Sequence, residues 1–135
     1  MQTNLKAPLF EGGSRLSIKA TGAITGGRFV KAGGFASGPG LNTSLAGGAI
    51  NAAHAGAGTR ATGVAESDVA NGADGIMFCG AGMIVPVTAG AAIVAGAEVE
   101  VGTAGKAITL NTGRPCGQAI NAAAADGDEI FVRLY

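Results

Sequence analysis

The chain has 135 residues, 25 of them glycine, with 47% hydrophobic and only 4% aromatic side chains and no tryptophan. A single domain of this length can bury a core built from Val, Ile, Leu and Ala. Nine basic residues balance nine acidic ones, so we expect neither a nucleic acid nor a membrane surface as a partner. Only 13% of the residues are charged, and a surface so poor in charge favours association with a partner or an assembly.

The first 13 residues are predicted to form an extended arm. They lack the long apolar stretch and the cleavage site of a signal peptide, so we expect synthesis in the cytoplasm. Among their polar residues stand Leu5, Pro8, Leu9 and Phe10, and the segment ends in two glycines. Such an arm either folds back to cap the domain or reaches out and adds to a partner's sheet. The sequence does not separate these two possibilities.

Short strands are predicted along residues 14–135, which we expect to form a single β domain. Apolar and polar side chains alternate around Leu16, Val99 and Ile108 and again in the last seven residues, as in strands that bury one face. Runs of β-branched residues bounded by glycines add further candidates. The predicted strands are residues 16–19, 28–32, 60–66, 75–79, 83–87, 98–101, 108–110, 114–120 and 129–135.

Helix is almost absent from this prediction. Residues 66–71 and 121–125 could each form a helical turn or two, which a glycine close behind would end. Residues 75–97 are uncharged and long enough to cross a bilayer, but glycines and Pro86 interrupt them and favour separate strands. We therefore predict an all-β fold, a small barrel or sandwich of about nine short, mostly antiparallel strands.

An internal repeat indicates that this fold is built from two similar halves. The segment GVAESDVANGADGIMF, residues 63–78, matches GQAINAAAADGDEIFV, residues 117–132, without a gap. Upstream, ATGAITGGRFV at residues 20–30 matches AGAAIVAGAEV at residues 89–99. Both pairs occur in the same order along the chain, which favours a duplicated unit over chance matches between small residues.

The two halves differ in one connection. Residues 33–59 form a long Gly/Ala-rich segment with almost no charge, whereas the second half has a much shorter connection at residues 102–113. A structureless segment of that length inside a compact domain is usually a binding loop or disordered. Its apolar residues Phe35, Leu41 and Leu45 favour docking against another surface.

The sequence offers little for catalysis or metal binding. His54 is the only histidine, and no acid or nucleophile lies near it, so we expect an exposed loop residue. Cys79 and Cys116 do not complete a zinc-site spacing, and we expect both to be reduced, buried side chains. We therefore expect no enzyme activity, no catalytic residue, no metal site and no cofactor.

The pattern of small residues resembles that of the head decoration, or capsid cement, proteins of tailed bacteriophages. In those proteins an early turn ends in valine, a Gly-Val-Ala strand follows, and a closing Gly-x-Ala segment runs through Gly-Asp into the last strand. The corresponding residues here are 27–30, 63–65 and 117–134. The resemblance covers most of residues 14–135, and the long segment at 33–59 departs from it.

The resemblance implies a structural virion protein, made in the host cytoplasm, that decorates the outer surface of a phage capsid. It implies a homotrimer at three-fold and quasi-three-fold positions that clamps neighbouring subunits of the major capsid protein and stabilises the shell. Two alternatives remain open: a β-rich structural module of a phage tail or baseplate, and a small enzyme that uses His54. The apolar residues of the arm and of the long segment give the expected capsid interface: Leu5, Pro8, Leu9, Phe10, Phe35, Leu41 and Leu45.

Overall fold

A computed structural model of the protein describes residues 4–9, 13–35 and 49–135. The prediction of an all-β fold is confirmed, since these residues form ten strands and one 3-10 turn. The elements are β1 (Ser14–Ala20), β2 (Phe29–Phe35), β3 (Ile50–His54), β4 (Gly63–Ala65), β5 (Asp74–Cys79), β6 (Ile84–Thr88), β7 (Glu98–Val101), η2 (Thr103–Gly105), β8 (Ala107–Thr109), β9 (Gly117–Ala119) and β10 (Glu129–Leu134).

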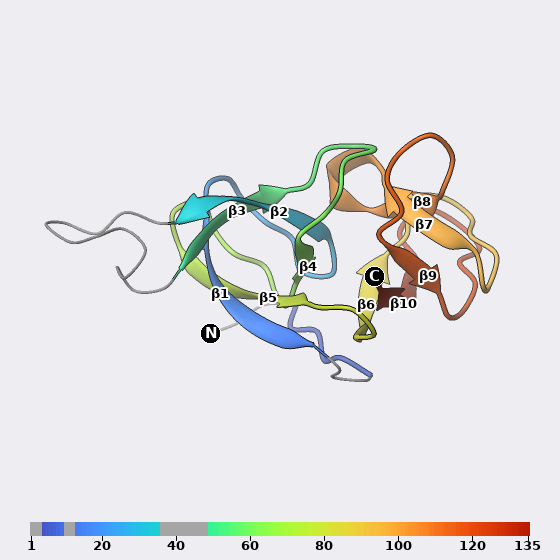
Figure 1. The fold of residues 1–135 in the computed structure, drawn as a ribbon, viewed down its shortest axis with the longest axis horizontal. Helices are drawn as coiled ribbons and strands as arrows, with labels where there is room; N and C mark the ends of the chain where they lie inside the picture. Colours follow the sequence, from blue (N-terminus) through green and yellow to red (C-terminus); the bar gives the residue numbers. More distant parts are fainter. Residues whose placement is uncertain (1–3, 10–12, 36–48) are drawn as a thin grey trace, which may run out of the picture.

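The strands form two sheets that lie side by side along the long axis of the molecule (Figure 1). The first five strands close into a barrel in the order β1-β3-β2-β4-β5, and the last five form a second sheet in the order β6-β10-β9-β7-β8. The pairs of named strands are antiparallel, except that β1 runs parallel to β3. The barrel and the second sheet therefore take consecutive halves of the chain.

Both halves have the same topology, which confirms the prediction of two similar halves. Strands β1 to β5 correspond in order to β6 to β10, and corresponding strands have corresponding neighbours. An isolated bridge joins Ile24 to Val69 in the barrel, and its counterpart joins Ile93 to Ala123 in the second sheet. The parallel pairing of β1 with β3 is reduced in the second sheet to one parallel bridge.

The gapless alignment of residues 63–78 with residues 117–132 is wrong after the bend that precedes the last strand of each half. β5 starts at Asp74, five residues after Val69, whereas β10 starts at Glu129, six residues after Ala123. The pairing registers of β5 with β1 and of β10 with β6 agree with this shift. Asp74 therefore corresponds to Glu129 and not to Asp128, because the second bend contains one more residue.

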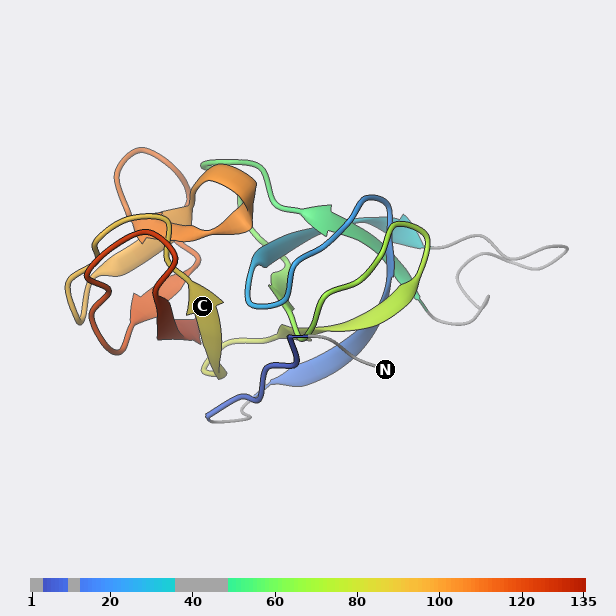
Figure 2. The same ribbon diagram turned by 180° about the vertical axis from the view of Figure 1, so that it is seen from behind.

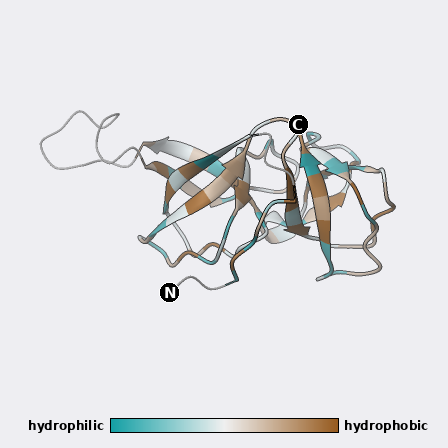
Figure 3. Cartoon of the chain, turned by 90° about the horizontal axis from the view of Figure 1, so that it is seen from below, coloured by the Kyte–Doolittle hydropathy of each residue, from teal (hydrophilic) through white to brown (hydrophobic). Residues whose placement is uncertain are grey.

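Each half has an interior of aliphatic and alanine side chains at corresponding positions. This agrees with the low aromatic content of the sequence. Figure 3 shows hydrophobic residues, in brown, along the strands of both halves. The barrel interior contains Ile18, Ala20, Ile24, Val30, Ala52, Ala65, Val69 and Met77. The corresponding residues of the second sheet, in the same order, are Val87, Ala89, Ile93, Val99, Ala107, Ala119, Ala123 and Val132.

An apolar row on the outer face of the barrel joins the two halves. Phe29, Val64 and Phe78 are neighbours across β2, β4 and β5, and each is buried to 99% or more. They belong to the same cluster as the interior of the second sheet, and not to the cluster inside the barrel. The two halves therefore share a continuous core.

The corresponding row on the second sheet is polar. Glu98, Gln118 and Arg133 are neighbours across β7, β9 and β10. Glu98 and Arg133 are exposed, and Gln118 is half-buried. The same strand positions thus bury two phenylalanines and a valine in the first half and carry partly exposed polar side chains in the second.

The connection expected at residues 33–59 is shorter than predicted. β2 continues to Phe35, and residues 50–54 form β3, which pairs with both β1 and β2 and closes the barrel. The sequence of β3, INAAH, has one β-branched residue and no alternation of large apolar side chains, so propensity alone did not identify it. Its central residue, Ala52, is buried inside the barrel, where a small side chain fits.

Residues 66–71 and 121–125 are not helical. The Ile24 and Val69 backbones exchange two hydrogen bonds, with N···O distances of 2.8 and 2.9 Å. Ile93 and Ala123 do the same at 3.0 and 2.9 Å. These bonds between bends take the place of bonds within a helical turn, so tertiary pairing overrides the local signal.

Candidate functional site

Residues 4–9 of the N-terminal arm fold back onto the protein. The Lys6 N–H donates to the Glu66 carbonyl oxygen at 2.6 Å, and the Leu9 N–H donates to the Ile84 carbonyl oxygen at 2.8 Å. The Lys6 ammonium group also pairs with the Glu129 carboxylate. Figure 2 shows this segment, in dark blue, passing along the junction of the two halves. Residues 4–9 therefore fold back onto the domain and do not reach out to a partner's sheet.

The start of the described arm lies against two bends of the barrel. The Asn4 side-chain amide donates to the Gly26 carbonyl at 3.2 Å and to Asp68 Oδ1 at 3.1 Å. The same carboxylate oxygen accepts the Gly26 N–H at 2.8 Å. A Cβ atom on Gly26 would lie 2.7 Å from the Asn4 carbonyl oxygen, so this close approach requires glycine. We call residues 24–27 and 66–69 the arm-binding surface.

A buried carboxylate supports the arm-binding surface. Glu66 is 1% exposed, and its side chain forms an ion pair with the Arg15 guanidinium group. The guanidinium carbon lies 5.6 Å from the centre of the Phe78 ring, within the range of a cation–π contact. The backbone of Glu66 thus binds the arm while its side chain is held by β1.

The arm presents two leucine side chains to solvent. Leu5 and Leu9 are 56% and 62% exposed, and Pro8 is half-buried. Hydrogen bonds from the Lys6 and Leu9 N–H groups hold the backbone that carries them. The arm therefore forms an exposed apolar surface of restricted conformation.

The other expected contact residues lie apart from this surface or outside the described residues. Phe35 is 51% exposed and is the last residue of β2. That strand ends at the end of the barrel remote from the second sheet (Figure 1). Phe10, Leu41 and Leu45 lie outside the described residues.

Two exposed apolar side chains were not anticipated from the sequence. Val94 is 75% exposed and Ile120 is 44% exposed. Each follows a residue that is buried in the second sheet, Ile93 and Ala119, so each points outward. The bridge between Ile93 and Ala123 brings their two bends together. The signal in the sequence is the repeat, which places these residues at the positions of Thr25 and Glu66.

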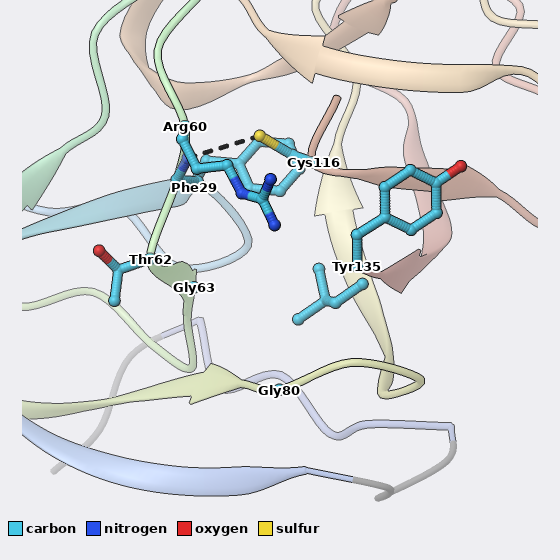
Figure 4. A pocket seen from close by; sticks show the side chains of 9 residues that line it. Phe29, Arg60, Thr62, Gly63, Gly80, Cys116 and Tyr135 are labelled. Atoms are coloured by element: carbon cyan, nitrogen blue, oxygen red, sulfur yellow. Dashed lines mark hydrogen bonds between the residues drawn. The ribbon is translucent and has the colours of Figure 1, made fainter. Parts of the chain in front are cut away.

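A small pocket opens between the two halves (Figure 4). The barrel contributes Arg60, Gly63 and Gly80, and the second sheet contributes Cys116 and Tyr135. Its volume of about 20 Å³ is enough for roughly one water molecule. The pocket is therefore too small to serve as a substrate site in this conformation.

Both cysteines are free thiols. Cys116 is buried as expected, and its sulfur accepts the Ala61 N–H at 3.5 Å. Cys79 is only half-buried, contrary to the expectation, and partial burial raises the pKa of its thiol. Cys116 therefore belongs to the contact between the two halves.

The expectation of an exposed loop position for His54 is wrong. His54 is the last residue of β3 and is half-buried, and its Nε2 accepts the Thr25 N–H at 2.9 Å. Burial, and to a smaller extent the charge of Arg28, lowers the pKa of His54 from its usual 6.5. The neutral ring therefore links β3 to the bend that carries the arm-binding surface.

The described part of the chain contains no group of three or more His, Cys, Asp or Glu side chains placed to hold a metal ion. Within the same residues, no helix has the length and hydrophobicity needed to cross a membrane.

Comparison with known proteins adds two similarities. A family model described as phage cement protein matches residues 10–134. The crystal structure of the N base of the head fiber gp8.5 in bacteriophage phi29 superposes with a TM-score of 0.67, covering 90% of this chain and 93% of that chain. The sequences are 20% identical, so this likeness concerns the fold. No curated protein matches the sequence.

Proposed function

Because the chain belongs to the phage cement protein family, we propose that this structural phage protein decorates the outer surface of the capsid and stabilises the shell. The family match over residues 10–134 is the observation that carries the proposal. In this role the protein is made in the host cytoplasm and clamps neighbouring subunits of the major capsid protein. Three copies act together at three-fold and quasi-three-fold positions.

The exposed leucines of the arm support a role in clamping. Leu5 and Leu9 present apolar area that a capsid subunit would bury, and each buried leucine contributes about 1.5–3 kcal/mol before the costs of association. The backbone bonds of the arm reduce the conformational entropy that binding would otherwise cost. Pro8, Phe10, Phe35, Leu41 and Leu45 complete the proposed capsid interface.

Stabilisation would follow from mass action. A protein that binds the assembled shell and not the separated subunits shifts the equilibrium toward the shell. Three linked copies raise the avidity without any single strong contact. This suits a chain that has no tryptophan to serve as a binding hot spot.

No reaction is part of the proposal. The one histidine, His54, uses its acceptor nitrogen to bind the Thr25 N–H. That contact supports a structural role and leaves the neutral ring without the free acceptor that a general base needs.

The test mixes the purified chain with undecorated capsids of its phage and measures co-sedimentation, the temperature at which the capsids break, and the native mass of the free chain. We expect saturable binding, a higher breaking temperature, and either a trimer or a monomer that trimerises on the shell. Failure to bind any capsid would contradict the proposal. Imaging labelled chains on virions separates the alternatives, since label on the tail and none on the head would favour a tail or baseplate module.

A further inference from the structure

The second sheet carries a counterpart of the arm-binding surface. Residues 93–96 and 120–123 occupy the positions that residues 24–27 and 66–69 occupy in the barrel, as the two isolated bridges show. We call residues 93–96 and 120–123 the second surface.

The backbones of the two surfaces share several hydrogen bonds. The Gly27 N–H donates to the Ala65 carbonyl at 2.9 Å, and the Gly96 N–H donates to the Ala119 carbonyl at 2.8 Å. Both glycines have positive φ, 75° and 86°, which side-chain-bearing residues rarely adopt. In the same way the Glu66 N–H donates to the Ile76 carbonyl of β5 at 2.9 Å, and the Ile120 N–H donates to the Phe131 carbonyl of β10 at 2.8 Å.

The side chains of the two surfaces differ in polarity. Thr25, Glu66 and Asp68 of the arm-binding surface correspond to Val94, Ile120 and Ala122 of the second surface. The second surface has no charged side chain and exposes Val94 and Ile120. The Asp68 carboxylate that holds the polar Asn4 side chain has no counterpart there. An occupant of the second surface should therefore be apolar.

One backbone acceptor differs between the two surfaces. The Glu66 carbonyl accepts the Lys6 N–H of the arm, whereas the Ile120 carbonyl accepts no hydrogen bond from the described residues. Each chain has one arm and two such surfaces. Even if arms were exchanged between copies, the described arm residues would fill only one of the two surfaces of each chain, which leaves the other for a different segment.

We propose that the second surface binds an extended, uncharged segment of the major capsid protein. A backbone N–H of that segment donates to the Ile120 carbonyl, and its apolar side chains cover Val94 and Ile120, as an added strand does at a sheet edge. The choice of partner rests on the proposed function. The geometry of the site does not depend on that choice.

The first test uses the double variant Val94→Thr and Ile120→Glu, which introduces the residues found at the corresponding barrel positions. Both side chains are exposed, so we expect an unchanged melting temperature. We expect binding to undecorated capsids to weaken about tenfold or more, because the variant removes the apolar side chains at the centre of the proposed contact. Ala73→Glu, at an exposed position of the barrel, is the matched control for added negative charge and should bind like the wild type.

A photo-crosslinking residue at position 120 provides a second readout that does not require the double variant to fold. On decorated capsids it should crosslink to the major capsid protein. Crosslinks to another copy of this chain, or to nothing, would overturn the inference, as would unchanged binding of the double variant. If the wild-type chain itself fails to bind capsids, the proposed function fails and the capsid is the wrong partner. Unchanged binding of the double variant to capsids that the wild type decorates overturns only the second surface.

Discussion

Gly75 and Val69 share one site in the barrel interior, since a Cβ atom on Gly75 would lie 2.4 Å from Cγ2 of Val69. In the second sheet the corresponding positions are held by Ile130 and Ala123. Gly75 is thus replaced by the larger Ile130, and Val69 is replaced by the smaller Ala123. This reciprocal exchange keeps the interior volume roughly constant, which a packed core tolerates better than a change at one position.

Gly75→Ala should lower the free energy of unfolding by about 1–3 kcal/mol, because the added Cβ would clash with Val69, whose β-branched side chain is restricted at χ1. In the double variant with Val69→Ala, the loss should be smaller than the sum of the two single losses. Urea denaturation of the four proteins in the cycle measures this coupling. Gly22→Ala is the control, since no atom lies within 4 Å of the added Cβ. Additive losses would show that the two positions do not share a site.

Phe78→Ala should destabilise the whole chain by about 3–5 kcal/mol, because the ring is fully buried in the core that both halves share. Arg133→Ala, at the corresponding exposed position of the second sheet, should change stability by less than about 0.5 kcal/mol. Thermal unfolding followed by circular dichroism should show one transition for the wild type. Separate melting of the barrel and the second sheet would contradict a shared core.

Leu5→Glu combined with Leu9→Glu should weaken capsid binding about tenfold or more without changing the melting temperature, because both side chains are exposed. Deletion of residues 1–9 should in addition lower the stability of the domain, since the bonds from Lys6 and Leu9 contribute roughly 1 kcal/mol each. Co-sedimentation and calorimetry separate the two effects. A deletion variant as stable as the wild type would mean that these backbone bonds contribute nothing.

The stability of the protein should decrease with acidification through His54. Its pKa in the folded protein lies below the usual 6.5, so protonation favours the unfolded chain. The contribution of the neutral ring is fully present above about pH 6.5 and is lost as the pH falls through the lowered pKa. Urea denaturation between about pH 7.5 and 5 should show a smaller loss for His54→Gln, whose amide oxygen can still accept the Thr25 N–H. Equal losses in the two proteins would exclude His54 as the cause.

The two thiols should differ in reactivity. Cys116 is buried and should react with a thiol reagent only on unfolding, whereas half-buried Cys79 should react in the folded protein, but more slowly than free cysteine. The raised pKa of Cys79 leaves less thiolate at a given pH, and the thiolate is the reactive form. Cys116→Ala identifies which thiol has reacted. Fast labelling of Cys116 in the folded protein would show that the contact between the halves opens readily.

The sequence was sufficient to predict the all-β class, the two halves and nine of the strands. The alternation of apolar and polar residues did not reveal β3, because its alanines have low strand propensity. The strand forms because it pairs with both β1 and β2. The local signal also failed at residues 66–71 and 121–125, because bonds to a distant bend decide their conformation. Part of the expected interface was found exposed, at Leu5, Leu9 and Phe35. The repeat aligns Val94 and Ile120 with Thr25 and Glu66, but only the structure showed that both apolar side chains are exposed.

The polar row Glu98, Gln118 and Arg133 has a consequence for the stacking of further units. Repeat proteins remain soluble only if a terminal unit carries a polar outer face, and this row gives the second half such a face. Because this row is polar, a further unit stacked on the second half would find no apolar row to pack against. A longer tandem could be engineered by placing Phe, Val and Phe at these positions and appending a further copy of the second half. The native pair could then serve as the first two modules of a designed array.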